Sequence, residues 1–282
     1  MMATTAAEAL ERFERTSDGD LAVTYFHEGK TPRQHPSAIL RVIGDELKGA
    51  AECPPRIMPL WLANAAGPLF DARVRKGIEV FPDGAAKAWG LRFYGELKRL
   101  DGRIPFSVIH DWHATAIGPM IVTFSQRPEP NPWLGADPPQ ALAALHAAAL
   151  AGRRIAADEW RPVLHDAFVH IHARGRLGPA VTATRRYTLD ETVVMEADAY
   201  ASAYAAADAD AFAQAHWNDS SGLDAYAGLA VAAYRIIQTH AKLLADPDPN
   251  YDRYQYLGNM HACIALARLA DGLVDCLARV AP

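Results

Sequence analysis

The chain contains 282 residues, of which 50% are hydrophobic and 22% are charged, a composition typical of a folded protein and not of a disordered one. Its 28 basic and 33 acidic residues give a net charge of -5 at pH 7. Because no run of Lys and Arg offers a surface for phosphate groups, we expect no nucleic-acid partner.

Four helices and one short strand are predicted in the first hundred residues. Thr5 and Glu8 have the spacing of a capping box and predict a helix that runs to Arg15. Ser37 follows a proline and is expected to cap a second helix over residues 38–51. The spacing of large residues predicts two further helices over 57–73 and 84–100. The segment 21–26 has the composition of a strand.

The middle of the chain contains a predicted helix and then the boundary between two lobes. The helix falls within residues 104–124, and the segment that follows carries prolines at positions 128, 130, 132, 138 and 139. Prolines favour an extended backbone. We therefore predict an N-terminal helical lobe over residues 1–126, a Pro-rich linker over 127–139 and a C-terminal Ala-rich helical bundle over 140–282.

The C-terminal half is predicted to be almost entirely helical. Asp137 followed by Pro138 favours the start of a helix that ends near Gly152, and Asp158 begins another that ends near Gly175. Alanine and regularly spaced large residues predict long helices over 189–217, 223–244 and 251–280, with one short strand over 181–187. The predicted fold class is mainly α, a multi-helix bundle of two packed helical lobes with at most a few short strands.

The cysteines and the hydropathy of the chain indicate in which cellular compartment the protein is expected. The three cysteines, Cys53, Cys263 and Cys276, have no CxxC spacing and favour neither a disulfide framework nor a thiolate zinc site. The N-terminus has no signal-peptide pattern, and the apolar stretch 226–237 is shorter than a membrane-spanning helix. We expect a cytoplasmic protein of bacterial type with no membrane partner.

The first candidate site is formed by His110 and His113. On a helical wheel both histidines fall within the apolar arc that contains Phe106, Ile117 and Met120. Two histidines one helical turn apart face each other and can share a metal ion, which would be a divalent transition metal. The alternative, which the sequence favours, is that both are core histidines hydrogen-bonded to the backbone or to a tyrosine.

A second group of histidines follows at positions 165, 170 and 172. If this segment is helical, His165 and His172 lie on the solvated face and are too far apart to hold one ion. His170 lies at the edge of the apolar face and is the member of this group that could meet the first pair. The predicted metal ligands are therefore His110, His113 and His170.

Known catalytic motifs are weak in this sequence. His110-Asp111 and His165-Asp166 each match the His-Asp pair of metal phosphohydrolases, but the match ends at the dipeptide. The Glu-x-x-His of di-iron bundles, the GxSxG elbow, the P-loop and the GxGxxG motif do not occur. The sequence does not decide whether the protein is an enzyme.

The C-terminal half resembles the alanine-rich helical region of bacterial proteins, some of which are classed as immunity proteins of polymorphic toxin systems. The resemblance rests on the composition and helical pattern of three segments, DEWRPVLHDAF (158–168), AYASAYAAADADAFAQAHW (199–217) and LARLADGLVDCLARV (266–280). It implies a compact helical protein that acts by binding another protein, and it carries over no catalytic residue.

Two functions from different classes follow from these observations. The first is a non-catalytic protein-binding protein of immunity type that uses helix faces as its interface. The alternative is a metal-dependent enzyme or small-ligand-binding protein with a His-lined site between helices. A third possibility is self-association, because alanine stripes can pack between chains as well as within one.

Overall fold

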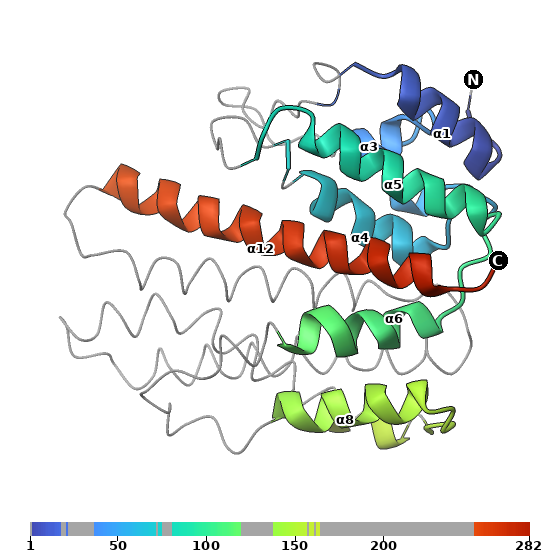
Figure 1. Cartoon of the computed structure of the whole chain (residues 1–282), viewed down its shortest axis with the longest axis vertical. Helices are drawn as coiled ribbons and strands as arrows, with labels where there is room; N and C mark the ends of the chain where they lie inside the picture. The colour runs from blue at the N-terminus through green and yellow to red at the C-terminus, as the bar shows by residue number, and fades with distance from the viewer. Residues whose placement is uncertain are drawn as a thin grey trace. The chain divides into compact units, whose positions relative to one another are not determined.

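The computed structural model describes residues 2–17, 21, 37–71, 73–74, 81–119, 138–156, 158–160, 162–163 and 251–282, and the regular structure within these ranges is helical throughout (Figure 1). The elements are α1 (Ala6–Arg15), α3 (Ala38–Arg41), η1 (Ala50–Glu52), α4 (Leu60–Asp71), α5 (Ala85–Arg99), α6 (Ser107–Trp112), η2 (His113–Ile117), α8 (Pro138–Leu150) and α12 (Tyr251–Arg279). The predicted mainly α fold is confirmed. No helix in these ranges has both the length and the apolar character needed to cross a membrane.

Several predicted elements lie outside the described residues. They are the helices over 189–217 and 223–244, the strand over 181–187, the strand over 21–26 apart from Leu21, and most of the helix that begins at Asp158. The helices predicted over 57–73, 84–100, 138–152 and 251–280 are confirmed as α4, α5, α8 and α12.

The chain divides into two compact units. Unit 1 contains residues 1–108 and 266–282, and unit 2 contains residues 109–265. This division differs from the predicted lobes, because the last residues of the chain belong to the same unit as the first. The predicted linker over 127–139 lies outside the described residues, except for the two prolines that open α8.

The N-terminal capping box of α1 is present in a shifted form. The Thr5 hydroxyl accepts a hydrogen bond from the backbone N–H of Glu8 at 3.2 Å, as the motif predicts. The Glu8 carboxylate accepts from the backbone N–H of Thr4 at 2.7 Å, and this bond holds the pKa of Glu8 below its ordinary value. At the other end, Lys87 donates to the carbonyl oxygens of Phe13, Glu14 and Thr16, at the C-terminus of the helix.

The core of unit 1 is built where α1 packs against α5. A Cβ atom on Gly90 of α5 would lie 2.1 Å from Cζ of Phe13, so the glycine allows the ring to rest on the backbone of the neighbouring helix. The Phe13 ring also meets Phe70 and Tyr94, with ring centroids 6.2 and 5.4 Å apart. Tyr94 is fully buried, and its hydroxyl donates to the carbonyl oxygen of Ile39, which satisfies the polar end of the ring.

The helix predicted over residues 38–51 is wrong beyond Arg41. The carbonyl oxygen of Ile43 accepts hydrogen bonds from the N–H of Ala3 at 2.6 Å and from the Arg12 guanidinium at 3.0 Å, so contacts with the N-terminal segment take the place of a continuing helix. The predicted cap is also different. The Ser37 hydroxyl makes no cap bond and donates to Gly67 and Asp71 on α4. Tertiary contacts have overridden the local helical signal here.

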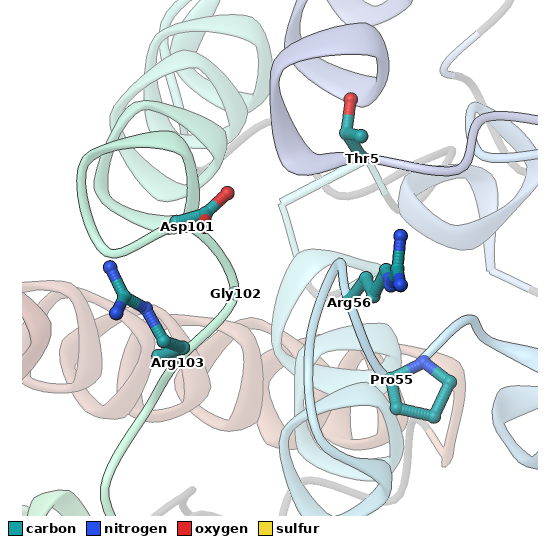
Figure 2. A pocket seen from close by; sticks show the side chains of 6 residues that line it. All are labelled: Thr5, Pro55, Arg56, Asp101, Gly102 and Arg103. Atoms are coloured by element: carbon teal, nitrogen blue, oxygen red, sulfur yellow. The ribbon is translucent and has the colours of Figure 1, made fainter.

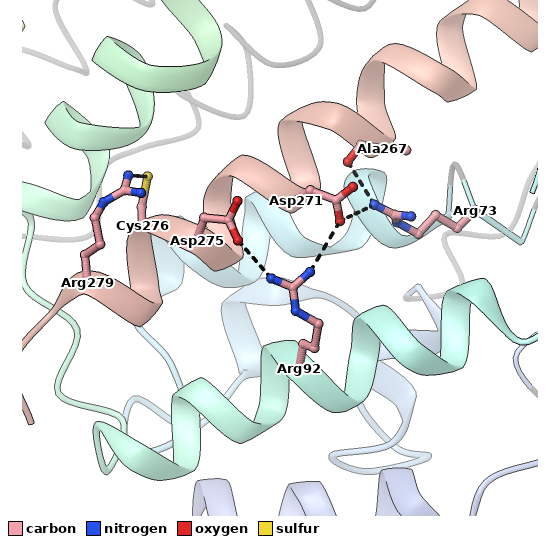
Figure 3. A network of polar contacts seen from close by, with 7 residues as sticks. All are labelled: Arg73, Arg92, Ala267, Asp271, Asp275, Cys276 and Arg279. Atoms are coloured by element: carbon pink, nitrogen blue, oxygen red, sulfur yellow. Dashed lines mark hydrogen bonds and ion pairs between the residues drawn. The ribbon is translucent and has the colours of Figure 1, made fainter.

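Charged side chains join the C-terminal part of α12 to the rest of unit 1, and Figure 3 draws two arginines and two aspartates among them. Arg73 follows α4 and donates to the Asp271 carboxylate at 2.7 Å and to the carbonyl oxygen of Ala267 at 2.8 Å. Arg92 of α5 donates to the Asp275 carboxylate at 2.8 Å. One apolar stripe of this part of α12 is buried, and it consists of Leu266, Leu269, Leu273 and Leu277. These contacts place the end of the chain in unit 1.

Candidate functional site

The first two predicted site residues lie where an α-helix changes into a π-helix. α6 begins after Pro105, whose carbonyl oxygen accepts from the N–H of Val108, and it contains His110. His113 opens the π-helical segment η2, and its carbonyl oxygen accepts from the N–H of Gly118, five residues further on. π-Helical turns are rare and occur often at functional sites. Both imidazoles are buried, with exposed fractions of 4% and 1%, which confirms their place on the apolar face.

A third histidine, His146, joins them from α8, which packs against η2 within unit 2. Its side chain has no exposed surface. Nδ1 of His146 lies 2.9 Å from Nδ1 of His110. Two imidazole nitrogens approach this closely only when something positively polarised lies between them, either a proton carried by one ring or a metal ion. We call His110, His113 and His146 the three-histidine cluster.

Ring stacking fixes the orientation of the three-histidine cluster. The rings of His113 and His146 are nearly parallel, with centroids 4.0 Å apart and an interplanar angle of 8°. Trp160 stacks on His110 at 5.7 Å and meets His146 edge to face at 5.0 Å. The cluster is thus held by aromatic neighbours on several sides, which restricts the rotation of each ring.

Burial sets the charge state of His113. Desolvation and, to a smaller extent, the neighbouring His110 together lower the pKa of His113 from 6.5 to about 3. A lowered pKa is expected for a buried base, because a low-dielectric environment disfavours the charged imidazolium. His113 is therefore neutral at pH 7. A neutral imidazole is the form that binds metal ions.

The two pairs of stacked or facing rings differ in whether they could bind one metal ion together. A ligating imidazole directs a nitrogen lone pair in the plane of its ring, so the parallel rings of His113 and His146 do not converge on one ion. The rings of His110 and His146 are inclined by 55° and their Nδ1 atoms face each other. Among the residues that the structure describes, no three His, Cys, Asp or Glu side chains have the arrangement of a complete metal site. His110 and His146 form at most half of one.

The predicted site and the structure overlap in part. His110 and His113 lie in one cluster, and His170 lies outside the described residues together with His165 and His172. The sequence analysis missed His146. The available signal was its position one helical turn after Leu142, which is also fully buried, in a helix whose limits were predicted correctly.

The resemblance of the C-terminal half to immunity-type proteins stays a prediction, and most of the segments that carry it lie outside the described residues. Comparison with known proteins adds no neighbour from which a residue role could be transferred. No protein-family model matches the chain, and no curated protein and no solved structure matches it either.

Proposed function

We propose that the protein binds a divalent transition metal ion through His110 and His146. The observation that carries the proposal is the separation of 2.9 Å between their facing Nδ1 atoms. Two imidazole nitrogens bound to one tetrahedral zinc ion, each at 2.0–2.1 Å, lie about 3.3 Å apart. The two nitrogens would therefore need to move apart by only a few tenths of an ångström to bind one such ion in place of the proton.

The composition of the surroundings supports the same proposal. A core position filled by an imidazole must satisfy two ring nitrogens that an apolar side chain lacks, so three adjacent buried histidines are costly unless they have a role. Imidazole is a ligand for zinc, copper, nickel and iron. His170 remains the predicted further ligand, and water or a backbone oxygen can complete the shell.

The burial of the cluster points to a structural ion. In the part of the chain that the structure describes, the three side chains are 0% to 4% exposed, so an ion bound there would be shielded from solvent. Catalytic zinc sites keep an open coordination position, whereas structural sites are closed. The ion would stabilise unit 2, and this is compatible with the protein-binding function that the sequence predicts. That function stays a prediction. In the described ranges the large exposed apolar side chains are Met2 and Leu150, so an interface there would be mainly polar.

Metal analysis of the purified protein tests the proposal. We expect about one transition metal ion per chain in the wild type and a loss of this ion in the double variant His110→Ala, His146→Ala. Leu150→Ala is the matched control, because Leu150 lies on the same helix as His146 and is 42% exposed. A wild-type protein that takes up no zinc, copper, nickel, iron or manganese from solution would contradict the proposal.

A further inference from the structure

Unit 1 contains a pocket of about 380 Å³ where three segments of the chain meet (Figure 2). Thr5 comes from the N-terminus of α1. Pro55 and Arg56 come from the turn between η1 and α4, and the third wall is the loop that follows α5. The full lining consists of Thr5, Pro55, Arg56, Asp101, Gly102 and Arg103. The size is that of a site for a small molecule.

The floor of the pocket is fixed by a backbone contact. Gly102 has a φ of +69°, and a Cβ atom at this position would lie 2.1 Å from the carbonyl oxygen of Arg56. The loop after α5 therefore rests directly on the turn that carries Arg56, and only glycine allows this approach. The N–H of Gly102 donates to the carbonyl oxygen of Leu97 at 3.0 Å, which anchors the loop to α5. The backbone of Asp101 is also in the left-handed region, with a φ of +50°.

Three charged side chains line the pocket without partners in the described part of the chain. Arg56, Asp101 and Arg103 are exposed, and none of them forms an ion pair or a side-chain hydrogen bond with another described residue. In Figure 2 Asp101 and Arg103 extend from one wall, and Arg56 extends from the opposite wall.

We propose that this pocket binds a small zwitterion that carries a carboxylate or phosphate group and an ammonium group. The guanidinium groups of Arg56 and Arg103 are donors of the kind that bind a carboxylate or phosphate group, and the Asp101 carboxylate can accept hydrogen bonds from the ammonium group. A simple anion would leave the Asp101 carboxylate facing a like charge, and a simple cation would face two guanidinium groups. A molecule with both charges complements all three side chains. The site involves none of the residues of the three-histidine cluster.

Calorimetric titration of the full chain tests the proposal with four probes. β-Alanine and phosphoethanolamine are zwitterions with a carboxylate and a phosphate group, and acetate and inorganic phosphate are the corresponding simple anions. We expect one zwitterion to bind with a dissociation constant in the micromolar to millimolar range, about tenfold or more below that of its simple anion. The zwitterion that binds identifies which anionic group the pocket takes.

Three variants assign the binding to the pocket. Arg56→Gln and Asp101→Asn should each weaken binding of the zwitterion about tenfold or more. Asparagine tolerates the left-handed backbone of residue 101, so the second variant removes the charge without changing the loop. Arg41→Gln is the control, since Arg41 is an exposed arginine of unit 1 outside the pocket, and it should bind like the wild type. The proposal is overturned if no probe binds the wild type, if the pocket variants bind equally well, or if the simple anions bind as tightly as the zwitterions.

Discussion

His110 and His146 are 36 residues apart in the sequence, and their Nδ1 atoms lie 2.9 Å from each other in the core of unit 2. The contact joins α6 to α8 through two polar atoms, and the adjacent rings of His113 and Trp160 are buried as well. Such a contact is sensitive to what lies between the two nitrogens, because an imidazole pair without a shared proton or ion would bring two lone pairs together.

Truncation of His146 should destabilise the protein. His146→Ala removes a buried ring that contacts His110, His113 and Trp160, and leaves a cavity beside polar atoms. We expect the free energy of unfolding to fall by about 2–4 kcal/mol. Urea unfolding followed by tryptophan fluorescence measures this loss. The control Leu150→Ala should change the free energy by less than about 0.5 kcal/mol, and an equal effect of the two substitutions would show that His146 is not a core residue.

Substitution of alanine for Gly95 and for Gly102 should change the free energy of unfolding in opposite directions. Gly95 lies within α5, and Gly102 lies in the loop that follows it. Gly102→Ala places a Cβ atom 2.1 Å from a backbone oxygen at a positive φ, and we expect a loss of about 2–4 kcal/mol in the free energy of unfolding. At Gly95, no heavy atom lies within 4 Å of the Cβ that alanine would add. Because alanine has a higher helix propensity than glycine, Gly95→Ala should stabilise the protein by about 0.5–1 kcal/mol. Thermal unfolding of both variants checks the pair. A stabilising Gly102→Ala would mean that the loop after α5 is not held against Arg56.

Asp271 and Asp275 of α12 should contribute unequally to the stability of the protein. The Arg73 side chain is 7% exposed, so Asp271→Asn removes the charged partner of a nearly buried guanidinium and should cost about 1–3 kcal/mol. Asp275 and Arg92 are both more than half exposed, and Asp275→Asn should cost less than about 0.5 kcal/mol. Equal losses in chemical denaturation would refute this ranking of the two ion pairs.

The thiol of Cys53 should be unreactive at pH 8. Burial raises the pKa of Cys53 from 9.0 to about 12, so the thiol stays protonated and its thiolate forms only as the pH rises toward 12. Since alkylation requires the thiolate, we expect iodoacetamide to modify Cys53 about a thousand times more slowly in the folded protein than in urea. Peptide mass spectrometry resolves this cysteine from the other two. Equal rates with and without urea would disprove the burial.

Local signals in the sequence predicted the limits of several helices well. The Thr5 cap of α1 and Pro138 at the first position of α8 are both determined by neighbouring residues. The prediction failed where distant residues decide. Residues 42–51 have a helical pattern, but Ala3 and Arg12 bind the carbonyl oxygen of Ile43 and the helix ends at Arg41.

The candidate site shows the same division between local and distant information. The burial of His110 and His113 could be predicted from helical periodicity, because both lie on one apolar face. The partner of His110 could not, since the pairing with His146 depends on how α8 packs against η2 and not on spacing within one helix. The stacking of His113 on His146 likewise depends on that packing.

Long-range nitrogen–proton NMR of the histidine rings in the full chain tests the central claim most directly, because it reports which ring nitrogens carry a proton or a metal ion. Before zinc is added to metal-free protein, we expect one of the two Nδ1 atoms of His110 and His146 to be protonated and the other to accept its hydrogen bond. One equivalent of zinc should remove that proton and shift the resonances of both Nδ1 atoms, and the shift should be absent in His146→Ala. Unchanged resonances of both rings in the presence of zinc would contradict the proposed metal site.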